Sequence, residues 1–447
     1  MVNRMNDRCA YGGAVAIVKP TAGGNYDDLI EQEGLFHVIS SGFAKGAIVD
    51  EMELIFCVTK VVQPYQQFDD YLAMATLPEL RIIVSNTTES GIVFEEGDRP
   101  SDRPANSFPG KLLQFLKARF DHFEGALDKG FIVLPCELIE RNGDVLEEIL
   151  SRLAKEWYDD ESFTTWISEA NEFCNTLVDR IVPGAPEVSK VKEYEDRSGF
   201  RDRIMVTSEP YHIWVIEGPD SLKEEFPLEG AGINAVVTDD LSKYRLQKVR
   251  LLNGAHTSMV PIGILLRVPT VGQFIGDSHL SSFLSKLLRE EVIPSISELD
   301  KDVLAAYTED VLDRFRNPFV EHKLSSIALN SISKFTVRVF PSIEGFIKLN
   351  GDVPERLTLA MAALLRFYEG SWSGKSLPVQ DSAENIQWFR QHWDGMTDLN
   401  ALVLSILSDR RIWGRDLSEI DGFVERVASA LSSIMNGNLS QEIRRLS

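Results

Sequence analysis

Short apolar runs that alternate with amphipathic stretches constrain the fold of the first half of this chain more than any other feature. The runs are rich in β-branched residues and end in polar residues or proline, as strands buried in a parallel sheet do. They lie at residues 14–20, 80–86, 130–138, 211–219 and 233–240. Between them, residues 109–127 and 143–160 repeat apolar residues at the i, i+3, i+4 spacing of helices. This alternation predicts a doubly wound α/β domain over residues 1–240.

Near residue 241 the pattern of the sequence changes. Isolated apolar runs almost disappear, and long segments with the spacing of amphipathic helices take their place. Clear examples lie at residues 277–296, 301–317, 357–370 and 422–437. Because 447 residues exceed the size of one ordinary hydrophobic core, a second domain is expected. The sequence therefore predicts an all-helical domain over residues 241–447, which would carry the substrate-binding and catalytic residues.

A formal net charge of −22 limits the partners of this chain. Such a field repels phosphate backbones, so nucleic acid is not expected to bind, and an acidic metabolite would need a local basic cluster. No stretch reaches the ~18 consecutive apolar residues of a membrane span, and the first residues lack the apolar core of a secretory signal. We therefore expect a cytoplasmic protein with a small-molecule substrate and no membrane partner. The sequence leaves its oligomeric state open.

The four cysteines and seven histidines are scattered along the chain, with no CxxC, HxH or HExxH spacing. Those spacings are the usual signatures of thiolate zinc sites and of paired histidine ligands. The sequence therefore predicts a reaction that needs no metal ion.

Three polar residues, Lys248, Asn253 and His256, interrupt an apolar, helix-like stretch. Asn253 and His256 share a helix face, whereas Lys248 lies about 80° and roughly 12 Å from His256 on an ideal helix. Hydride transfer between an alcohol and a nicotinamide needs a base for the hydroxyl proton and donors for the alkoxide oxygen. A lysine withdrawn from water can be that base, and asparagine and histidine can be the donors. The spacing alone fits equally a surface lysine, a helix-interior asparagine and a satisfied core histidine.

The segment around these residues, KVRLLNGAHTSMVPIGILL, resembles the reactive helix of the long-chain mannitol dehydrogenase family. That helix carries Lys, then Asn five positions later, then His three positions after the Asn. Further similarity covers nearly the whole chain, most of all to the tagaturonate reductase branch. It includes SNTTESGI (85–92), FPGKLL (108–113), ALDKGFIVLPCELIERNGD (126–144), FCNTLVDRIV (173–182), RFRNPFVEHKLSSIALNSISKF (314–335) and PVQD (378–381). The resemblance implies a Rossmann-like domain followed by a helical domain, with NAD as the cofactor.

For the reacting groups, the resemblance implies a role residue by residue. Lys248 would be the general base, with Asn253 and His256 as the partners of the oxyanion. Asn175 would contact the reacting end of the substrate or of the nicotinamide, although an asparagine there could equally cap a helix or a turn. Lys334 would be a substrate-side lysine or, alternatively, part of a solvated helix face.

For the cofactor, the resemblance implies that Asn86, Thr88 and Glu89 line its cleft after a sheet strand. A polar turn often has that composition without any ligand. The strand that matches the family's second strand ends at Lys19, with no acidic residue to hold a ribose hydroxyl. Lys19 could instead tolerate a 2′-phosphate, so the residues leave NAD and NADP open, and the resemblance favours NAD.

The start of the chain departs from the family pattern. Family members open with a strand and a glycine-rich turn, similar to GxGxFxR, that approaches the pyrophosphate. Here Met1 lies in what resembles the first helix, and neither Gly12-Gly13 nor Gly23-Gly24 stands between a first strand and a helix. We therefore expect a family member without its N-terminal glycine-rich βα unit, and weakened cofactor binding.

Two further departures concern the substrate. Polyol-oxidising members carry an arginine eight positions before the residue that corresponds to Lys334, and this chain has Ser326 there. Those members also carry a pair of acidic residues where this chain has Glu217 followed by Gly218. Both changes fit the uronate branch, because a uronate carboxylate needs cationic or amide donors. The nearest candidates are Lys334, Arg314, Arg316 and His322. The resemblance thus implies NAD-linked interconversion of tagaturonate and altronate. The alternatives are fructuronate and mannonate, a polyol, or a non-catalytic relative that has lost nucleotide binding.

Overall fold

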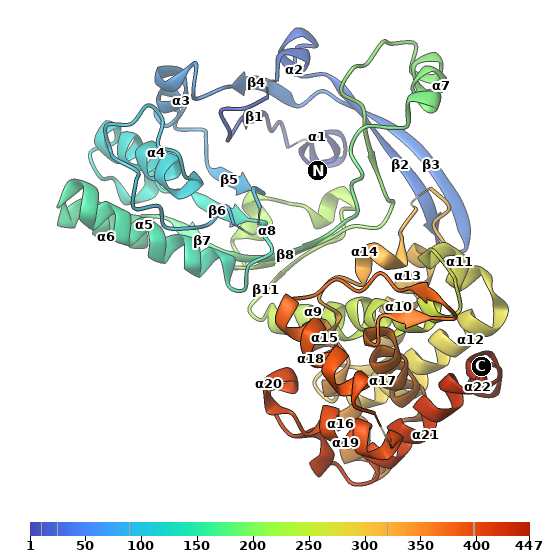
Figure 1. The fold of residues 1–447 in the computed structure, drawn as a ribbon. Helices are drawn as coiled ribbons and strands as arrows, with labels where there is room; N and C mark the ends of the chain where they lie inside the picture. Colours follow the sequence, from blue (N-terminus) through green and yellow to red (C-terminus); the bar gives the residue numbers. More distant parts are fainter. Residues whose placement is uncertain (10, 25, 89, 320, 397) are drawn as a thin grey trace. The chain divides into compact units, whose positions relative to one another are not determined.

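The computed structural model describes residues 1–9, 11–24, 26–88, 90–319, 321–396 and 398–447. They divide into two compact units, and Figure 1 labels most of their helices and strands. Unit 1 contains Met1–Ser41 and Asp50–Ser242, and unit 2 contains Gly42–Val49 and Lys243–Ser447. Where the sequence placed the boundary at residue 240, unit 1 ends at Ser242, and the tip of one hairpin is assigned to unit 2.

Parallel strands separated by helices form unit 1 (Figure 1), which confirms the predicted α/β class. The parallel pairs are β1 (Val15–Val18) with β4 (Val58–Val62), β5 (Ile82–Ser85) with β6 (Ile132–Pro135), β6 with β7 (Glu172–Phe173), and β10 (Ile213–Glu217) with β11 (Ala235–Thr238). The strands β1, β5, β6, β10 and β11 are those that the apolar runs predict. One strand that no apolar run marks, β8 (Asn175–Asp179), pairs antiparallel with β10.

Both faces of β6 are buried, and this explains its continuous apolar sequence. Successive side chains of a strand point to opposite faces, so Val133 packs with residues of α3 to α6, whereas Ile132 and Leu134 pack with residues of α1 and α8. The helices of this unit are α1 (Val2–Cys9), α2 (Asp27–Glu31), α3 (Phe68–Met74), α4 (Phe108–His122), α5 (Asn142–Tyr158), α6 (Glu161–Ala170), α7 (Val188–Ser198) and α8 (Leu222–Glu225). The strand is therefore covered by helices on both sides, as the doubly wound prediction requires.

No apolar run in the sequence marks the hairpin of β2 (Phe36–Ala44) and β3 (Ala47–Ile55), in which β2 also pairs with β9 (Val206–Ser208). The strand β3 mixes charged and apolar residues because much of it is exposed, whereas β2 is largely buried but has histidine, serine and glycine among its apolar residues. Lys45 and Gly46 join the two strands with positive φ angles of 51° and 75°, the conformation of a two-residue hairpin turn. A lysine in the first of these positions lacks the Asn-Gly or Asp-Gly signal from which such a turn is predicted.

Helices make up most of unit 2, and α17 (Glu355–Tyr368) is buried at every position from Leu357 to Tyr368. The other elements are α9 (Ser242–Gln247), the π-helical segments Lys248–Asn253 and Leu287–Val292, the 3-10 helices Ile293–Ser295 and Leu417–Glu419, α10 (Gly254–Leu265), α11 (Val271–Gly276), α12 (Ser278–Lys286), α13 (Lys301–Phe315), α14 (Leu324–Ile327), α15 (Ser331–Arg338), α16 (Phe340–Asn350), β12 (Ser371–Trp372), β13 (Lys375–Ser376), α18 (Ala383–Asp394), α19 (Leu399–Leu407), α20 (Arg410–Trp413), α21 (Phe423–Met435) and α22 (Leu439–Leu446). The short hairpin β12–β13 is a departure from the all-helical expectation. Across the described residues, no helix is both long enough and apolar enough to cross a membrane.

Candidate active site

The predicted reactive residues lie in unit 2, where the π-helical segment Lys248–Asn253 runs directly into α10. Each backbone hydrogen bond of a π-helix spans five residues, so the ideal-helix angle between Lys248 and His256 does not apply here. Short π segments inside helices frequently occur at functional sites. The structure therefore confirms that the stretch is helical and adds an irregular turn at the lysine.

Arg250 anchors this irregular turn. Its Nε donates a hydrogen bond to Ser342 Oγ at 2.8 Å, and a terminal nitrogen donates to Ser295 Oγ at 2.9 Å. Burial lowers the pKa of Arg250 to about 10, and both serines lie on other elements of unit 2. The turn that carries Lys248 is thus tied to α16 and to the short 3-10 helix Ile293–Ser295, which follows the second π segment.

His256 has a half-buried ring whose Nε2 is buried and makes no hydrogen bond within the described residues. The ring centroid lies 4.5 Å from that of Phe315 and 5.0 Å from that of His322. Burial first, and then the charges of neighbouring cations, hold the pKa of His256 well below its ordinary value. The imidazole is therefore neutral at neutral pH and keeps one unused hydrogen-bonding nitrogen.

The basic side chains that lower the pKa of His256 form what we call the basic cluster: Arg314, His322, Lys334 and Arg338. Arg314 is buried on α13, while Lys334 and Arg338 lie four positions apart on α15. Lys334 Nζ donates to the carbonyl of Ile327 at 2.9 Å, and burial lowers the pKa of Lys334. Burial also lowers the pKa of His322, with a further contribution from Arg314. In a chain with a strongly negative net charge, this part of unit 2 is locally positive.

The remaining candidates of unit 2 differ in exposure. Lys248 and Asn253 are half-buried, and the carbonyl of Asn253 accepts a hydrogen bond from Thr257 Oγ1 at 2.8 Å. Arg316 is exposed and forms a 3.0 Å ion pair with Asp313, so it is set apart from the basic cluster. Within the described residues, no three histidine, cysteine, aspartate or glutamate side chains group so that they could hold a metal ion.

Asn175, the predicted contact in unit 1, uses its whole side-chain amide within the protein. Its Oδ1 accepts from the backbone nitrogens of Gly143 at 3.0 Å and Asp144 at 3.2 Å, at the start of α5. Its Nδ2 donates to Asp144 Oδ1 at 3.0 Å and to Glu217 Oε2 at 2.9 Å. An asparagine side chain has two acceptor and two donor positions, and all four are filled. In the structure Asn175 therefore caps the start of α5, which is the alternative role named above. Its contact with a substrate stays a prediction.

The predicted cofactor residues lie at the carboxyl ends of parallel strands in unit 1. Asn86 and Thr88 are exposed directly after β5, and Glu89 lies outside the described residues. Lys19 follows β1 but is buried, and its Nζ donates to the carbonyl of Thr21. Asn86 is therefore open to a ligand in unit 1. Thr88 is exposed too, although its hydroxyl shares a 3.0 Å hydrogen bond with Ser90 Oγ, and the ammonium of Lys19 is engaged locally.

Glu137 holds the turn after β5 and was not among the residues that the sequence singled out. Its buried carboxylate accepts from Ser85 Oγ at 3.0 Å and from the nitrogen and hydroxyl of Thr87, both at 2.9 Å. The only sequence signal is its place near the end of the apolar run at residues 130–138. Arg338 was missed as well, and its signal is the four-residue spacing from Lys334.

Neither glycine pair stands where the family's glycine-rich turn would. Gly23-Gly24 lies between β1, the strand that resembles the family's second strand, and the helix α2. That helix is a single short turn whose first residues include Asp27 and Asp28, and negative charges at a helix start oppose a phosphate. Gly12-Gly13 lies between α1 and β1, in the opposite order.

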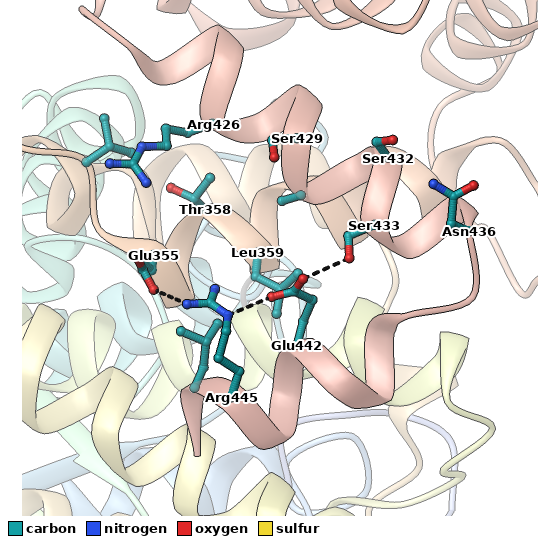
Figure 2. Close-up of a pocket in the computed structure, with 13 residues that line it drawn as sticks. Glu355, Thr358, Leu359, Arg426, Ser429, Ser432, Ser433, Asn436, Glu442 and Arg445 are labelled. Carbon is teal, nitrogen blue, oxygen red and sulfur yellow. Dashed lines mark hydrogen bonds and ion pairs between the residues drawn. The ribbon is translucent and has the colours of Figure 1, made fainter.

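A hollow of about 520 Å³ is lined mainly by residues of α17, α21 and α22. Figure 2 shows these residues. Arg445 lies between Glu355 at 2.8 Å and Glu442 at 3.0 Å, and Ser433 Oγ donates to Glu442 at 2.8 Å. Its lining includes neither the reactive residues nor the basic cluster. Because these charged groups pair with one another, the hollow does not qualify as the reactive centre.

Comparison with known families assigns both halves of the chain. Residues 20–230 match the mannitol dehydrogenase Rossmann domain, and residues 240–435 match the mannitol dehydrogenase C-terminal domain. The chain is 39% identical over 450 residues to the altronate oxidoreductases of Escherichia coli K12 and Escherichia coli O157:H7. These alignments cover 100% of this chain and 93% of each relative.

Solved structures share the fold of the chain. A D-sorbitol dehydrogenase in substrate-free form is 21% identical, with a TM-score of 0.78 over 99% of this chain and 93% of that one. The mannitol 2-dehydrogenase of Pseudomonas fluorescens, solved as a ternary complex with NAD and D-mannitol, is also 21% identical. Its TM-score is 0.64, over 99% of this chain and 92% of that one. At this identity the two structures support the architecture and carry no argument about the substrate.

Proposed function

The chain belongs to the mannitol dehydrogenase family, and we propose that it is an NAD-linked oxidoreductase that interconverts tagaturonate and altronate. The observation that carries the proposal is the full-length similarity to altronate oxidoreductases, joined to the basic cluster around His256. A neutral imidazole with an unused nitrogen suits an alcohol or carbonyl oxygen, and neighbouring cations suit a carboxylate. Both needs are those of a keto sugar acid.

Lys248, Asn253 and His256 divide the chemistry at the reacting oxygen. When altronate is oxidised, the Lys248 amine takes the hydroxyl proton, and in the reverse direction its ammonium returns that proton to the carbonyl oxygen. Asn253 and His256 donate hydrogen bonds to the oxygen while it carries negative charge. His256 can donate from Nε2 because that nitrogen has no acceptor within the described residues and the ring is neutral. NAD, when bound, accepts or returns the hydride.

Unit 1 offers polar groups where a dinucleotide would meet a parallel sheet, beyond the carboxyl ends of its strands. Asn86 and Thr88 are exposed there, on the turn that Glu137 fastens. Gly91 belongs to the same turn, and a Cβ at this position would collide with the side chain of Thr87. A turn that is fixed and tightly packed fits the binding of the ribose or nicotinamide part of NAD. Asn86 and Thr88 would hold it.

A direct assay tests the proposal. Tagaturonate, fructuronate and fructose are each supplied with NADH, and altronate, mannonate and mannitol with NAD, while absorbance at the nicotinamide band is followed. We expect tagaturonate and altronate to have the highest kcat/KM. A preference for fructuronate or for the neutral sugars would move the chain to another branch, and inactivity with all six would favour the non-catalytic alternative. Dialysis against a strong chelator should leave the activity unchanged.

A further inference from the structure

Arg338 is a partly buried cation that has no hydrogen bond or ion pair within the part of the chain that the structure describes. It stands at the end of α15, and burial lowers its pKa. Each nitrogen of its guanidinium keeps some contact with solvent, so the group stays accessible. Charges withdrawn from water are normally paired, because desolvation is costly. An accessible, unpaired and partly buried guanidinium is therefore suited to an anionic ligand.

Lys334, one helical turn earlier on the same face of α15, differs from Arg338 in this respect. Its Nζ already donates to the carbonyl of Ile327, and the charge of Asp381 acts on it favourably. Asp381 itself accepts hydrogen bonds from the Tyr368 hydroxyl and the Asn385 amide. Arg338 has none of these partners. Its planar fork of N–H groups also matches the two oxygens of a carboxylate, which a lysine cannot match.

The end of α15 lies directly against the reactive segment. A Cβ built on Gly254, which stands between Asn253 and His256, would be 3.2 Å from the carbonyl oxygen of Arg338. The charge of Arg338 also acts on His256 and Lys334. A ligand held by this guanidinium is therefore close to the residues proposed to act on the reacting oxygen.

From this placement we infer that Arg338 binds the carboxylate of the substrate and sets the preference for sugar acids over neutral sugars. The inference rests on the proposed function and names the group that recognises the acid end of the same substrate. Arg314 and Lys334 contribute positive charge around it, but Arg338 is the cation that offers an unoccupied fork.

The test compares Arg338→Gln and Arg338→Lys with wild type in the full-length chain. Arg390→Gln is the matched control, because Arg390 is an exposed arginine on α18 in the same unit. For each protein we would measure kcat and KM for tagaturonate and for fructose, the affinity for NADH by fluorescence, and the melting temperature. Arg338→Gln should raise the KM for tagaturonate roughly 10- to 100-fold, the range of one hydrogen bond to a charged group. Fructose turnover and NADH affinity should change less than about twofold, and Arg338→Lys should lie in between.

The outcomes separate this inference from the proposed function. If wild type reduces tagaturonate and Arg338→Gln leaves its KM unchanged, Arg338 does not bind the carboxylate, and the proposed function stands. An equal loss with fructose, or a weaker affinity for NADH, overturns the inference by assigning Arg338 to the common sugar chain or to the cofactor. Should Arg338→Gln fail to fold, Arg338→Lys decides, and an unchanged KM for tagaturonate contradicts the inference. Wild type that is inert with tagaturonate overturns both.

Discussion

Asn175 in unit 1 and His256 in unit 2 both stand in motifs that the family shares, yet the structure treats them in opposite ways. Asn175 has four hydrogen bonds and is buried, whereas His256 has a buried Nε2 without a partner within the described residues. Leaving a buried polar atom unpaired destabilises the folded state, and filling every position stabilises it. The contrast suggests that Asn175 maintains unit 1, while His256 retains a hydrogen bond for a ligand. A motif alone does not distinguish these two uses.

The largest effect should come from the reactive segment itself. Lys248→Ala removes the proton acceptor, and we expect kcat for altronate oxidation to fall roughly 10²- to 10⁴-fold. The melting temperature should stay close to that of wild type, because Lys248 is only half-buried. Lys348→Ala is the control, since Lys348 is exposed on α16. Turnover within a few-fold of wild type would show that another group carries the proton.

His256→Leu tests whether His256, unlike Asn175, serves a ligand and not the stability of the fold. The change removes both ring nitrogens and keeps apolar bulk beside Phe315, so kcat should fall roughly 10²- to 10³-fold through the loss of an oxyanion donor. Replacing an unpaired polar atom by an apolar group should leave the free energy of unfolding unchanged or raise it. Urea unfolding and steady-state kinetics on the same preparation measure both quantities. A strongly destabilised variant would mean that His256 is structural after all.

Asn175→Ala should produce the opposite pattern. It removes the cap of α5 and leaves Asp144 and Glu217 without their shared donor, so the free energy of unfolding should fall by roughly 1–3 kcal/mol. Asn350→Ala, at an exposed asparagine with one local hydrogen bond, is the matched control. If Asn175→Ala keeps its stability but raises the KM for altronate, the comparison fails. The role implied by the resemblance would then hold.

The sequence predicted the architecture well because its signals are local. A strand that is buried on both faces, such as β6, has a continuous apolar sequence. The amphipathic helices of unit 2 repeat apolar residues at helical spacing, so both kinds of element can be predicted from short stretches of sequence. The β2–β3 hairpin was not predicted because the exposed strand β3 mixes charged and apolar residues, because serine and glycine interrupt the apolar residues of β2, and because Lys45 gives no turn signal. The state of each site residue was equally hidden, since it depends on partners distant in sequence. Asn175, for example, is satisfied by residues of α5 and β10, and Arg338 is distinguished only by the absence of a described partner.

The smallest effect we predict is a pH dependence of stability that belongs to His256. In the folded state the pKa of this ring lies well below the ordinary 6.5, whereas in the unfolded chain it is ordinary. As pH falls below about 6.5, the unfolded state therefore binds a proton that the folded state does not bind, and the free energy of unfolding decreases by up to about 1.4 kcal/mol per pH unit. His256→Leu removes this contribution, while His322, whose pKa is also lowered by burial, keeps its own. Urea unfolding of wild type and variant at pH 7.5, 6.5 and 5.5 (chosen roughly to span the titration) should show the variant gaining relative stability as the pH falls. Parallel curves would mean that His256 titrates normally, and that the unpaired nitrogen which separates it from Asn175 has a partner in solution.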